Sequence, residues 1–149
     1  MKTYDKNGYK FLYPDNWMLE ETDFDDDEGS ITLNSPSGAF WILMVRPFGH
    51  NPDELANDAL KLMRRQYDRD FEYDRIERTI EDHKLSGYEM NFYYLDLTNT
   101  AVVLTFADES RTFAVFWQTG DQMVVTSEKE PFSHEEVFEA ITISLLRNI

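Results

Sequence analysis

Polar and hydrophobic positions alternate through the first part of the chain, which is the pattern of strands that bury one face. Residues 9–13 carry an aromatic side chain at every second position and stop at a Pro-Asp-Asn turn, and residues 17–22 are predicted to return as a second strand. Residues 30–34 alternate in the same way, and a Ser-Pro-Ser-Gly turn leads from them to the hydrophobic residues 39–45. This second pair is predicted to be a β-hairpin.

Further along the chain, hydrophobic runs at residues 85–95, 100–107 and 111–119 predict three more strands. A weaker strand is predicted within residues 71–81, where the period is not clean. The polar residues 98–99 are predicted to form a short break between two of these strands, so a β-meander is the simplest connection.

The first of two predicted helices begins at Asn51, a candidate N-cap that is followed by a proline and two acidic residues, and ends near Asp68. Its hydrophobic positions recur every three to four residues, as in a helix that covers a core. They are Leu55, Ala59, Leu62, Met63 and Tyr67.

The second predicted helix begins with a capping box from Ser133 to Glu136, and Phe132 and Val137 occupy the positions of a hydrophobic staple. Its hydrophobic stripe follows at helical spacing and is expected to face a core. The stripe consists of Phe138, Ile141, Leu145 and Ile149.

Hydrophobic residues occupy both faces of the strands at residues 40–45 and 113–117, which is typical of strands that are covered on both sides. Because two amphipathic helices are available, one helix on each face is the economical arrangement. The sequence therefore predicts an α+β fold: a three-layer α/β/α sandwich around a mainly antiparallel sheet with meander connections.

Length and composition indicate one domain over residues 1–149 and exclude some chemistry. The chain has no cysteine, so disulfides, zinc–thiolate sites and thiol nucleophiles are ruled out. It opens without the hydrophobic segment of a signal peptide, and the longest hydrophobic run, residues 39–45, is too short to span a bilayer. We therefore expect a cytoplasmic protein.

Acidic residues outnumber basic ones by 29 to 14, for a net charge of −15. That balance disfavours binding to nucleic acid or to an anionic membrane surface and would steer in a basic partner. The alternative is that the charge only keeps the domain soluble. Oligomeric state stays open between a monomer and a homodimer.

An acidic loop at residues 23–28 has carboxylates at the first, third and fifth positions, as an EF-hand calcium loop does. Its sixth position is Glu28 instead of glycine, and its twelfth is Asn34 instead of a bidentate glutamate. We therefore expect a solvated loop and no metal site.

Sequence motifs of catalysis are absent. His50, His83 and His134 are scattered and are expected to be surface or capping residues, and no nucleophile elbow or glycine-rich phosphate loop occurs. The sequence therefore predicts no catalytic residues and no cofactor.

Aromatic residues make up 15% of the chain, and some of them are expected to line a groove where a helix leaves strand surface uncovered. An aromatic patch beside an acidic loop is typical of a protein-binding surface. The residues predicted to bind the partner are Asp25, Asp26 and Asp27 for steering, and Trp41, Tyr93 and Phe116 for contact.

Two motifs resemble the PsbP-like superfamily, which includes the PsbP extrinsic subunit of photosystem II, a Ran-binding nuclear-import factor and bacterial domains of unknown function. They are aromatic-x-x-Pro-x-x-Trp at Phe11, Pro14 and Trp17, and Ile-x-x-Ser-Leu at Ile141, Ser144 and Leu145. The resemblance covers about residues 9 to 147 and implies an α/β/α sandwich around an antiparallel sheet, in a single PsbP-like domain. Its members act mostly by binding other proteins.

These observations together favour a non-catalytic domain that binds a protein partner as an adaptor or accessory subunit. A basic partner is favoured over an acidic one. Two alternatives stay open. One is a chaperone that shelters an apolar segment of a secreted effector, as some bacterial members of the superfamily do. The other is a small-ligand-binding domain or an enzyme whose site assembles from residues distant in sequence.

Overall fold

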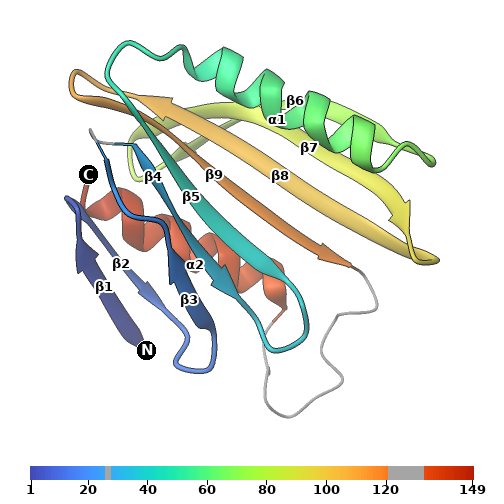
Figure 1. Ribbon diagram of the computed structural model, residues 1–149, viewed down its shortest axis with the longest axis horizontal. Coiled ribbons are helices and arrows are strands. Elements are labelled where there is room, and N and C mark those ends of the chain that lie inside the picture. The colour runs from blue at the N-terminus through green and yellow to red at the C-terminus, as the bar shows by residue number, and fades with distance from the viewer. Residues whose placement is uncertain (26–27, 121–132) are drawn as a thin grey trace.

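The computed structural model describes residues 1–25, 28–120 and 133–149 and has a mainly antiparallel α+β fold (Figure 1). The elements in chain order are β1 (Lys2–Lys6), β2 (Tyr9–Tyr13), β3 (Met18–Glu21), β4 (Gly29–Asn34), β5 (Phe40–Pro47), α1 (Pro52–Gln66), β6 (Glu72–Ile80), β7 (His83–Tyr94), β8 (Leu97–Ala107), β9 (Arg111–Gly120) and α2 (His134–Arg147). One seven-stranded sheet has the order β3-β4-β5-β9-β8-β7-β6, and β1 and β2 form a separate two-stranded sheet.

Strand β9 occupies the middle of the large sheet, between β5 and β8. The antiparallel meander from β6 to β9 confirms the predicted connection, and the weak strand within residues 71–81 proves to be β6. The predicted hairpin is also confirmed, because β4 pairs with β5 in antiparallel register with Asn34 opposite Phe40. Pairing of β5 with β9, which places Trp41 opposite Trp117, joins this hairpin to the meander.

The two helices lie against opposite faces of the large sheet, as the side chains of β9 demonstrate (Figure 1). Phe113, Val115 and Trp117 belong to the core that includes α2, whereas Ala114 and Phe116 belong to the core that includes α1. Helix α1 packs against β7, β8 and β9, and α2 packs against β9 and β2. This arrangement explains why both faces of the central strands are hydrophobic.

Helix α2 begins as predicted, with the side-chain oxygen of Ser133 accepting a hydrogen bond of 3.2 Å from the backbone N–H of Glu136. Phe138, Ile141 and Leu145 are fully buried under the sheet. The backbone N–H of Leu12 donates a hydrogen bond of 3.0 Å to the hydroxyl of Ser144 and so links β2 to α2. The predicted staple residue Phe132 lies outside the described residues.

Helix α1 has the predicted N-cap, because Oδ1 of Asn51 accepts a hydrogen bond of 2.8 Å from the N–H of Asp53. The helix ends two residues before the predicted boundary. Its buried residues are Ala56, Leu60 and Met63. Of the predicted stripe, Met63 is buried, Leu55, Ala59 and Tyr67 are partly buried against the same core, and Leu62 is exposed.

The pairing predicted around Pro14 is wrong. Strand β2 pairs with β1, and β3 pairs with β4, so the turn after Tyr13 connects the two sheets. The first strand escaped prediction because its composition is polar. A signal for it exists in Asn7 and Gly8, whose φ values of 56° and 82° suit the two-residue turn of a β-hairpin.

The break predicted at residues 98–99 is also wrong. Asn99 is buried within β8 and lies opposite Phe92. The turn lies three residues earlier, at Leu95 and Asp96, which have φ values of 53° and 59°. Leucine seldom adopts positive φ, so of the two turn residues only Asp96 is of a type that favours a turn.

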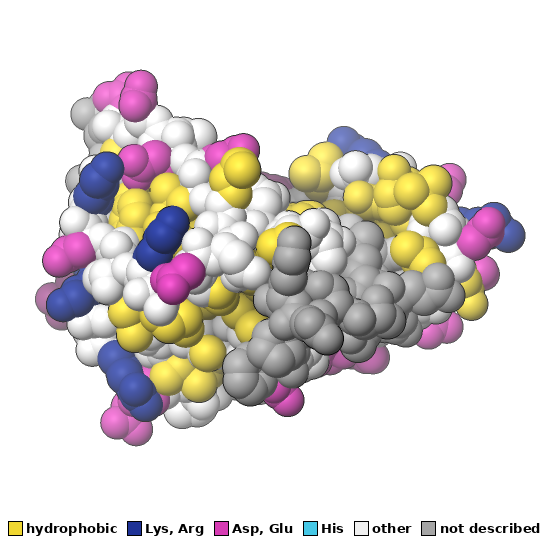
Figure 2. Space-filling model, turned by 90° about the horizontal axis from the view of Figure 1, so that it is seen from below, with side chains coloured by type: hydrophobic (Ala, Val, Ile, Leu, Met, Phe, Trp, Pro, Cys, Tyr) yellow, Lys and Arg dark blue, Asp and Glu magenta, His cyan; other side chains and the backbone are white. Residues whose placement is uncertain are grey.

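Acidic side chains are spread around the outline of the molecule, with hydrophobic side chains exposed between them (Figure 2). The exposed hydrophobic residues include Leu62 on α1 and Leu95 in the β7–β8 turn. No helix among the described residues has both the length and the hydrophobicity needed to cross a bilayer.

Candidate functional site

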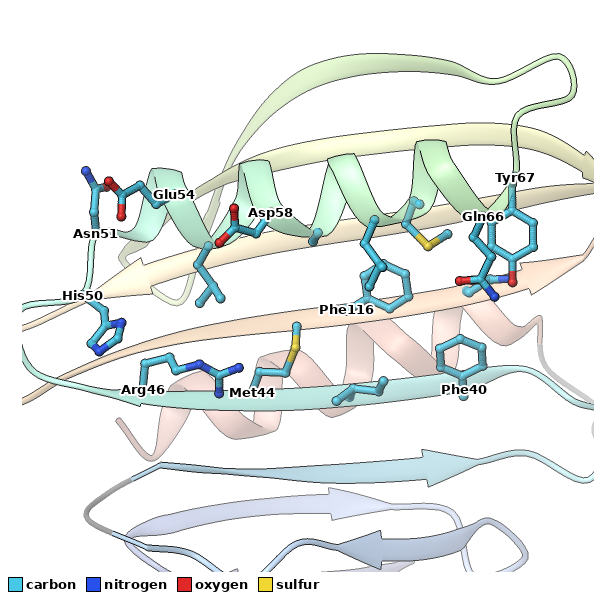
Figure 3. A pocket seen from close by; sticks show the side chains of 16 residues that line it. Phe40, Met44, Arg46, His50, Asn51, Glu54, Asp58, Gln66, Tyr67 and Phe116 are labelled. Atoms are coloured by element: carbon cyan, nitrogen blue, oxygen red, sulfur yellow. The ribbon is translucent and has the colours of Figure 1, made fainter.

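A groove of about 760 Å³ runs along α1 on the side that faces β5 (Figure 3). Helix α1 forms one wall, and the outward-facing residues of β5 and β9 form the floor. The groove exists because α1 covers β7, β8 and β9, and no helix among the described residues covers the same face of β5. An uncovered strip of sheet beside a helix was expected from the sequence, and the structure places it here.

The floor of the groove is hydrophobic. Phe40, Ile42 and Met44 alternate along β5 and are half-buried, whereas the intervening residues of this strand face the α2 core. The ring of Phe40 stacks on that of Phe116 from β9, with 5.9 Å between the centroids and 20° between the planes. These side chains give the groove a continuous apolar surface.

The wall of the groove uses hydrophobic residues of α1 at the border of its contact with the sheet: Leu55 and Ala59 are partly buried against the core, and Leu62 is exposed. Leu55, Ala59 and Leu62 lie one above another at helical spacing and line the groove. The side chain of Leu62 is 62% exposed, although it belongs to the stripe predicted to face a core.

The two ends of the groove are polar. Arg46, His50 and Asn51 lie at one end, and Gln66 and Tyr67 lie at the other (Figure 3). The floor of the groove is therefore apolar between two polar ends.

Two exposed carboxylates, Glu54 and Asp58, stand on α1 along the groove (Figure 3). The basic residue Arg46 lies across from them, with its Nε 3.5 Å from a carboxylate oxygen of Glu28. Because Glu28 balances that positive charge, the rim is negative overall.

The acidic loop borders the groove. A second hollow of about 420 Å³ is lined by Asp23 and Glu28 and shares Ile42, Met44 and Arg46 with the groove. A ligand in the groove would therefore lie close to the negative charge of the loop.

The residues predicted for steering are only partly described. Asp25 is exposed and forms a backbone bridge with Glu28. Asp26 and Asp27 lie outside the described residues, so their positions stay predictions.

The three aromatic residues predicted for contact do not share one surface. Phe116 lines the groove, but Trp41 is fully buried in the α2 core and cannot touch a partner. Tyr93 is 45% exposed. Its position on β7 follows the parity of Leu85, which faces the α2 core, so Tyr93 lies on the sheet face opposite Phe116. Alternation along each strand separates these residues.

Sequence reasoning missed the residues that build most of the groove: Phe40, Ile42, Met44, Leu55, Ala59 and Leu62. A signal for them was available, because α1 has more hydrophobic positions than one sheet contact requires. Which strands α1 covers depends on tertiary packing, and the sequence pattern does not contain that information.

His134, which was expected to be a surface or capping residue, is buried in the first turn of α2. Its Nε2 lies 2.9 Å from the hydroxyl of Ser37, and its Nδ1 lies 2.8 Å from the hydroxyl of Thr119. A serine and a histidine at this distance resemble a nucleophile and its base, but the third group is a neutral hydroxyl that cannot stabilise an imidazolium as a carboxylate does. We interpret the cluster as a link between the β4–β5 turn and α2.

A perturbed pair of titratable groups lies away from the groove, at β1 and β3. Burial, together with a hydrogen bond of 2.8 Å to Glu21, raises the pKa of Tyr4 to about 12. The same hydrogen bond holds the pKa of Glu21 below its usual range. Within residues 1–25, 28–120 and 133–149 there is no group of three or more histidine, aspartate or glutamate side chains placed to hold a metal ion.

Comparison with known proteins reveals a likeness of fold. No protein-family model and no curated protein sequence matches the chain. A solved structure from Bacteroides thetaiotaomicron VPI-5482 is similar over 96% of this chain at 11% identity, with a TM-score of 0.56. The chain spans 47% of that protein, about half of its length.

Two further structures are similar at lower TM-scores. PA94 of Pseudomonas aeruginosa, a protein of unknown function and putative regulator, has 12% identity over 83% of this chain and 85% of its own, with a TM-score of 0.46. LpqN of Mycobacterium tuberculosis, involved in cell envelope biogenesis, has 9% identity over 93% of this chain and 80% of its own, with a TM-score of 0.45.

Proposed function

We propose that this chain is a non-catalytic binding domain whose groove beside α1 receives an apolar segment of a basic protein partner. The observation that carries the proposal is the hydrophobic wall of α1, in which Leu62 is 62% exposed and Leu55 and Ala59 are partly buried, beside the half-buried hydrophobic floor of β5. A hydrophobic surface of this kind is costly to leave in water unless a partner covers it.

The shape of the groove favours a polypeptide over a small molecule. Small-molecule sites enclose most of the ligand and bring a few polar groups together at one point. Here the groove is open along one side of α1, and its polar groups are spread over its two ends, near His50 and Gln66, and along its wall, at Glu54 and Asp58.

The charge of the rim favours a basic partner. Glu54 and Asp58 stand along the wall, and the acidic loop borders the floor, in a chain whose net charge is −15. Charges at the rim of an interface act mainly on the association rate, and salt screens them. The acidic loop therefore steers the partner, and the hydrophobic groove holds it.

We also assign the fold to the three-layer α/β/α class, with α1 and α2 as the outer layers, because the cores under the two helices lie on opposite faces of the large sheet. This assignment agrees with what the resemblance to the PsbP-like superfamily implies, and that superfamily acts mostly through protein binding. The partner-binding surface proposed here is confined to the α1 layer.

Selection from a random peptide library against the purified domain tests the proposal. We expect the selected sequences to combine hydrophobic residues with Lys or Arg. They should bind Leu62→Gln about tenfold more weakly, since one leucine side chain leaves the interface. Leu12→Gln is the matched control, because Leu12 is also exposed but lies on β2, away from the groove.

Association kinetics separate the two parts of the proposal. The double variant Glu54→Gln and Asp58→Asn should slow association and flatten its salt dependence, while Leu62→Gln should accelerate dissociation. Selection of acidic peptides, or binding that neither set of substitutions changes, would overturn the proposal.

A further inference from the structure

We propose that the segment received by the groove is an amphipathic α-helix with a basic polar face, which lies over β5 alongside α1 and extends the helical layer. This inference rests on the proposed function and specifies the conformation of the partner. It follows from four properties of the groove: the pairing of its floor strands, the spacing between α1 and β5, the pattern of its hydrophobic residues, and the charges on its wall.

The floor strands offer no free backbone groups to an extended segment. Both edges of β5 are paired, since Ile42 lies opposite Thr32 of β4 on one side and Phe116 of β9 on the other. Phe116 is in turn opposite Val103 of β8, so β9 is also paired on both sides. A buried extended peptide would leave its N–H and C=O groups without partners, whereas a helix satisfies most of its own. The floor therefore favours a helix.

The spacing of the sheet fits a second helix beside α1. Helix α1 packs over β8, with β7 and β9 on either side, and β5 is two strands away from β8. Adjacent strands are about 4.8 Å apart, which puts β5 about 10 Å from the strand beneath α1. Packed helices lie about 8–10 Å apart, so a helix over β5 would contact both α1 and the sheet.

The hydrophobic residues of the groove match such a helix. On α1, Leu55, Ala59 and Leu62 form a stripe along the border of the buried side, and the small Ala59 at its centre permits close approach of another helix. On β5, the apolar floor runs from Phe40 to Met44, about 14 Å, which about nine helical residues would span. A helix of about three turns is thus sufficient to cover the groove.

The charges specify the polar side of the bound helix. Glu54 and Asp58 are exposed on α1 and line the groove, one helical turn apart. Helices packed side by side place residues of opposite charge next to the hydrophobic contact. Lys or Arg residues flanking the hydrophobic stripe of the partner would lie against these two carboxylates.

Two synthetic peptides of identical composition test the inference against the full chain. Each has about 14 leucine and lysine residues, arranged in one peptide with the helical period and in the other with the alternation of a strand. A third peptide carries glutamate in place of lysine in the helical arrangement. Affinity is measured by calorimetry at low and high salt, and peptide helicity by circular dichroism before and after binding.

We expect the helical lysine peptide to bind at least about tenfold more tightly than the alternating peptide and to gain helicity on binding. Its affinity should fall with Leu62→Gln and stay unchanged with Leu12→Gln, and the glutamate peptide should bind weakly. Equal or tighter binding of the alternating peptide, still sensitive to Leu62→Gln, would overturn the helical inference and leave the proposed function standing. Binding of no peptide, or binding insensitive to Leu62→Gln, would overturn both.

Discussion

The indole N–H of Trp41 donates a hydrogen bond of 3.0 Å to the hydroxyl of Thr142 on α2, and both residues are fully buried. The same hydroxyl donates to the backbone carbonyl of Phe138 at 2.8 Å, so its donor and an acceptor site are both used. Trp41 lies on β5 directly opposite Trp117 of β9. This hydrogen bond therefore joins the centre of the sheet to α2 in a part of the core that is otherwise hydrophobic.

Thr142→Val should destabilise the domain by about 1–3 kcal/mol, because it leaves the buried indole N–H without an acceptor. Urea denaturation measures the loss. Trp41→Phe serves as the second arm of a double-mutant cycle, and the cost of Thr142→Val should shrink in that background. If Thr142→Val destabilises the Trp41→Phe variant as much as it destabilises the native chain, the hydrogen bond is not the cause of the loss.

Ile141→Asp should unfold the domain or cost several kcal/mol, because it places an unpaired charge in the fully buried core beneath α2. Thermal denaturation followed by circular dichroism is the measurement. Leu62→Asp is the matched control on α1, and it should change the melting temperature little because Leu62 is exposed. An unchanged melting temperature for Ile141→Asp would contradict the docking of α2 on the sheet.

Leu95→Asn should stabilise the domain by about 0.5–1 kcal/mol, because asparagine adopts positive φ more readily than leucine does. Leu95 has a φ of 53° and is 75% exposed, so its side chain contributes little packing to lose. The urea midpoint measures the gain. Leu12→Asn, at an exposed strand position with ordinary φ, should give no gain, and a loss of stability with Leu95→Asn would contradict the strained turn.

Alkaline pH should destabilise the domain through Tyr4, whose pKa is raised to about 12 from an ordinary value of 10.0. Between these two values the folded state retains a proton that the unfolded chain releases. Stability is therefore fully present below pH 10 and falls as the pH rises towards 12, by on the order of 2 kcal/mol.

Urea denaturation at about pH 9 and about pH 11.5 measures the effect of Tyr4. Tyr4→Phe should reduce the fall in stability between the two pH values, whereas Tyr93→Phe, at an exposed position, should not. An equal fall in both variants would assign the alkaline loss to other groups.

The elements predicted from local pattern are those whose local signals agree with the tertiary structure. The capping of α1 by Asn51 and of α2 by Ser133 is confirmed, as is the hairpin around the turn that precedes Ala39. In each case a side chain or a turn fixes the backbone within a few residues. The meander is confirmed because short connections leave sequential strands as neighbours.

The predictions that are wrong depended on partners distant in sequence. Nothing near Met18 indicates that β3 pairs with β4, and nothing near Trp41 tells which face of β5 lies under α2. A groove beside a helix was expected from the sequence, but the residues that line it were not. Its position depends on tertiary packing, because α1 covers β8 and leaves Ile42 in the floor of the groove. The burial of His134 could not be read from the sequence because its hydroxyl partners, Ser37 and Thr119, are not its neighbours in the chain.

The central position of β9 also affects how the chain folds during synthesis. The β4–β5 hairpin is complete early, but one edge of β5 has no neighbour until β9 has been made, after the whole of α1 and the strands β6 to β8. Until α2 follows, the hydrophobic face that contains Trp41 is without its helix. An unpaired edge beside an uncovered hydrophobic face is the species most prone to aggregate during folding. The nascent chain is thus expected to depend on general chaperones until α2 has docked.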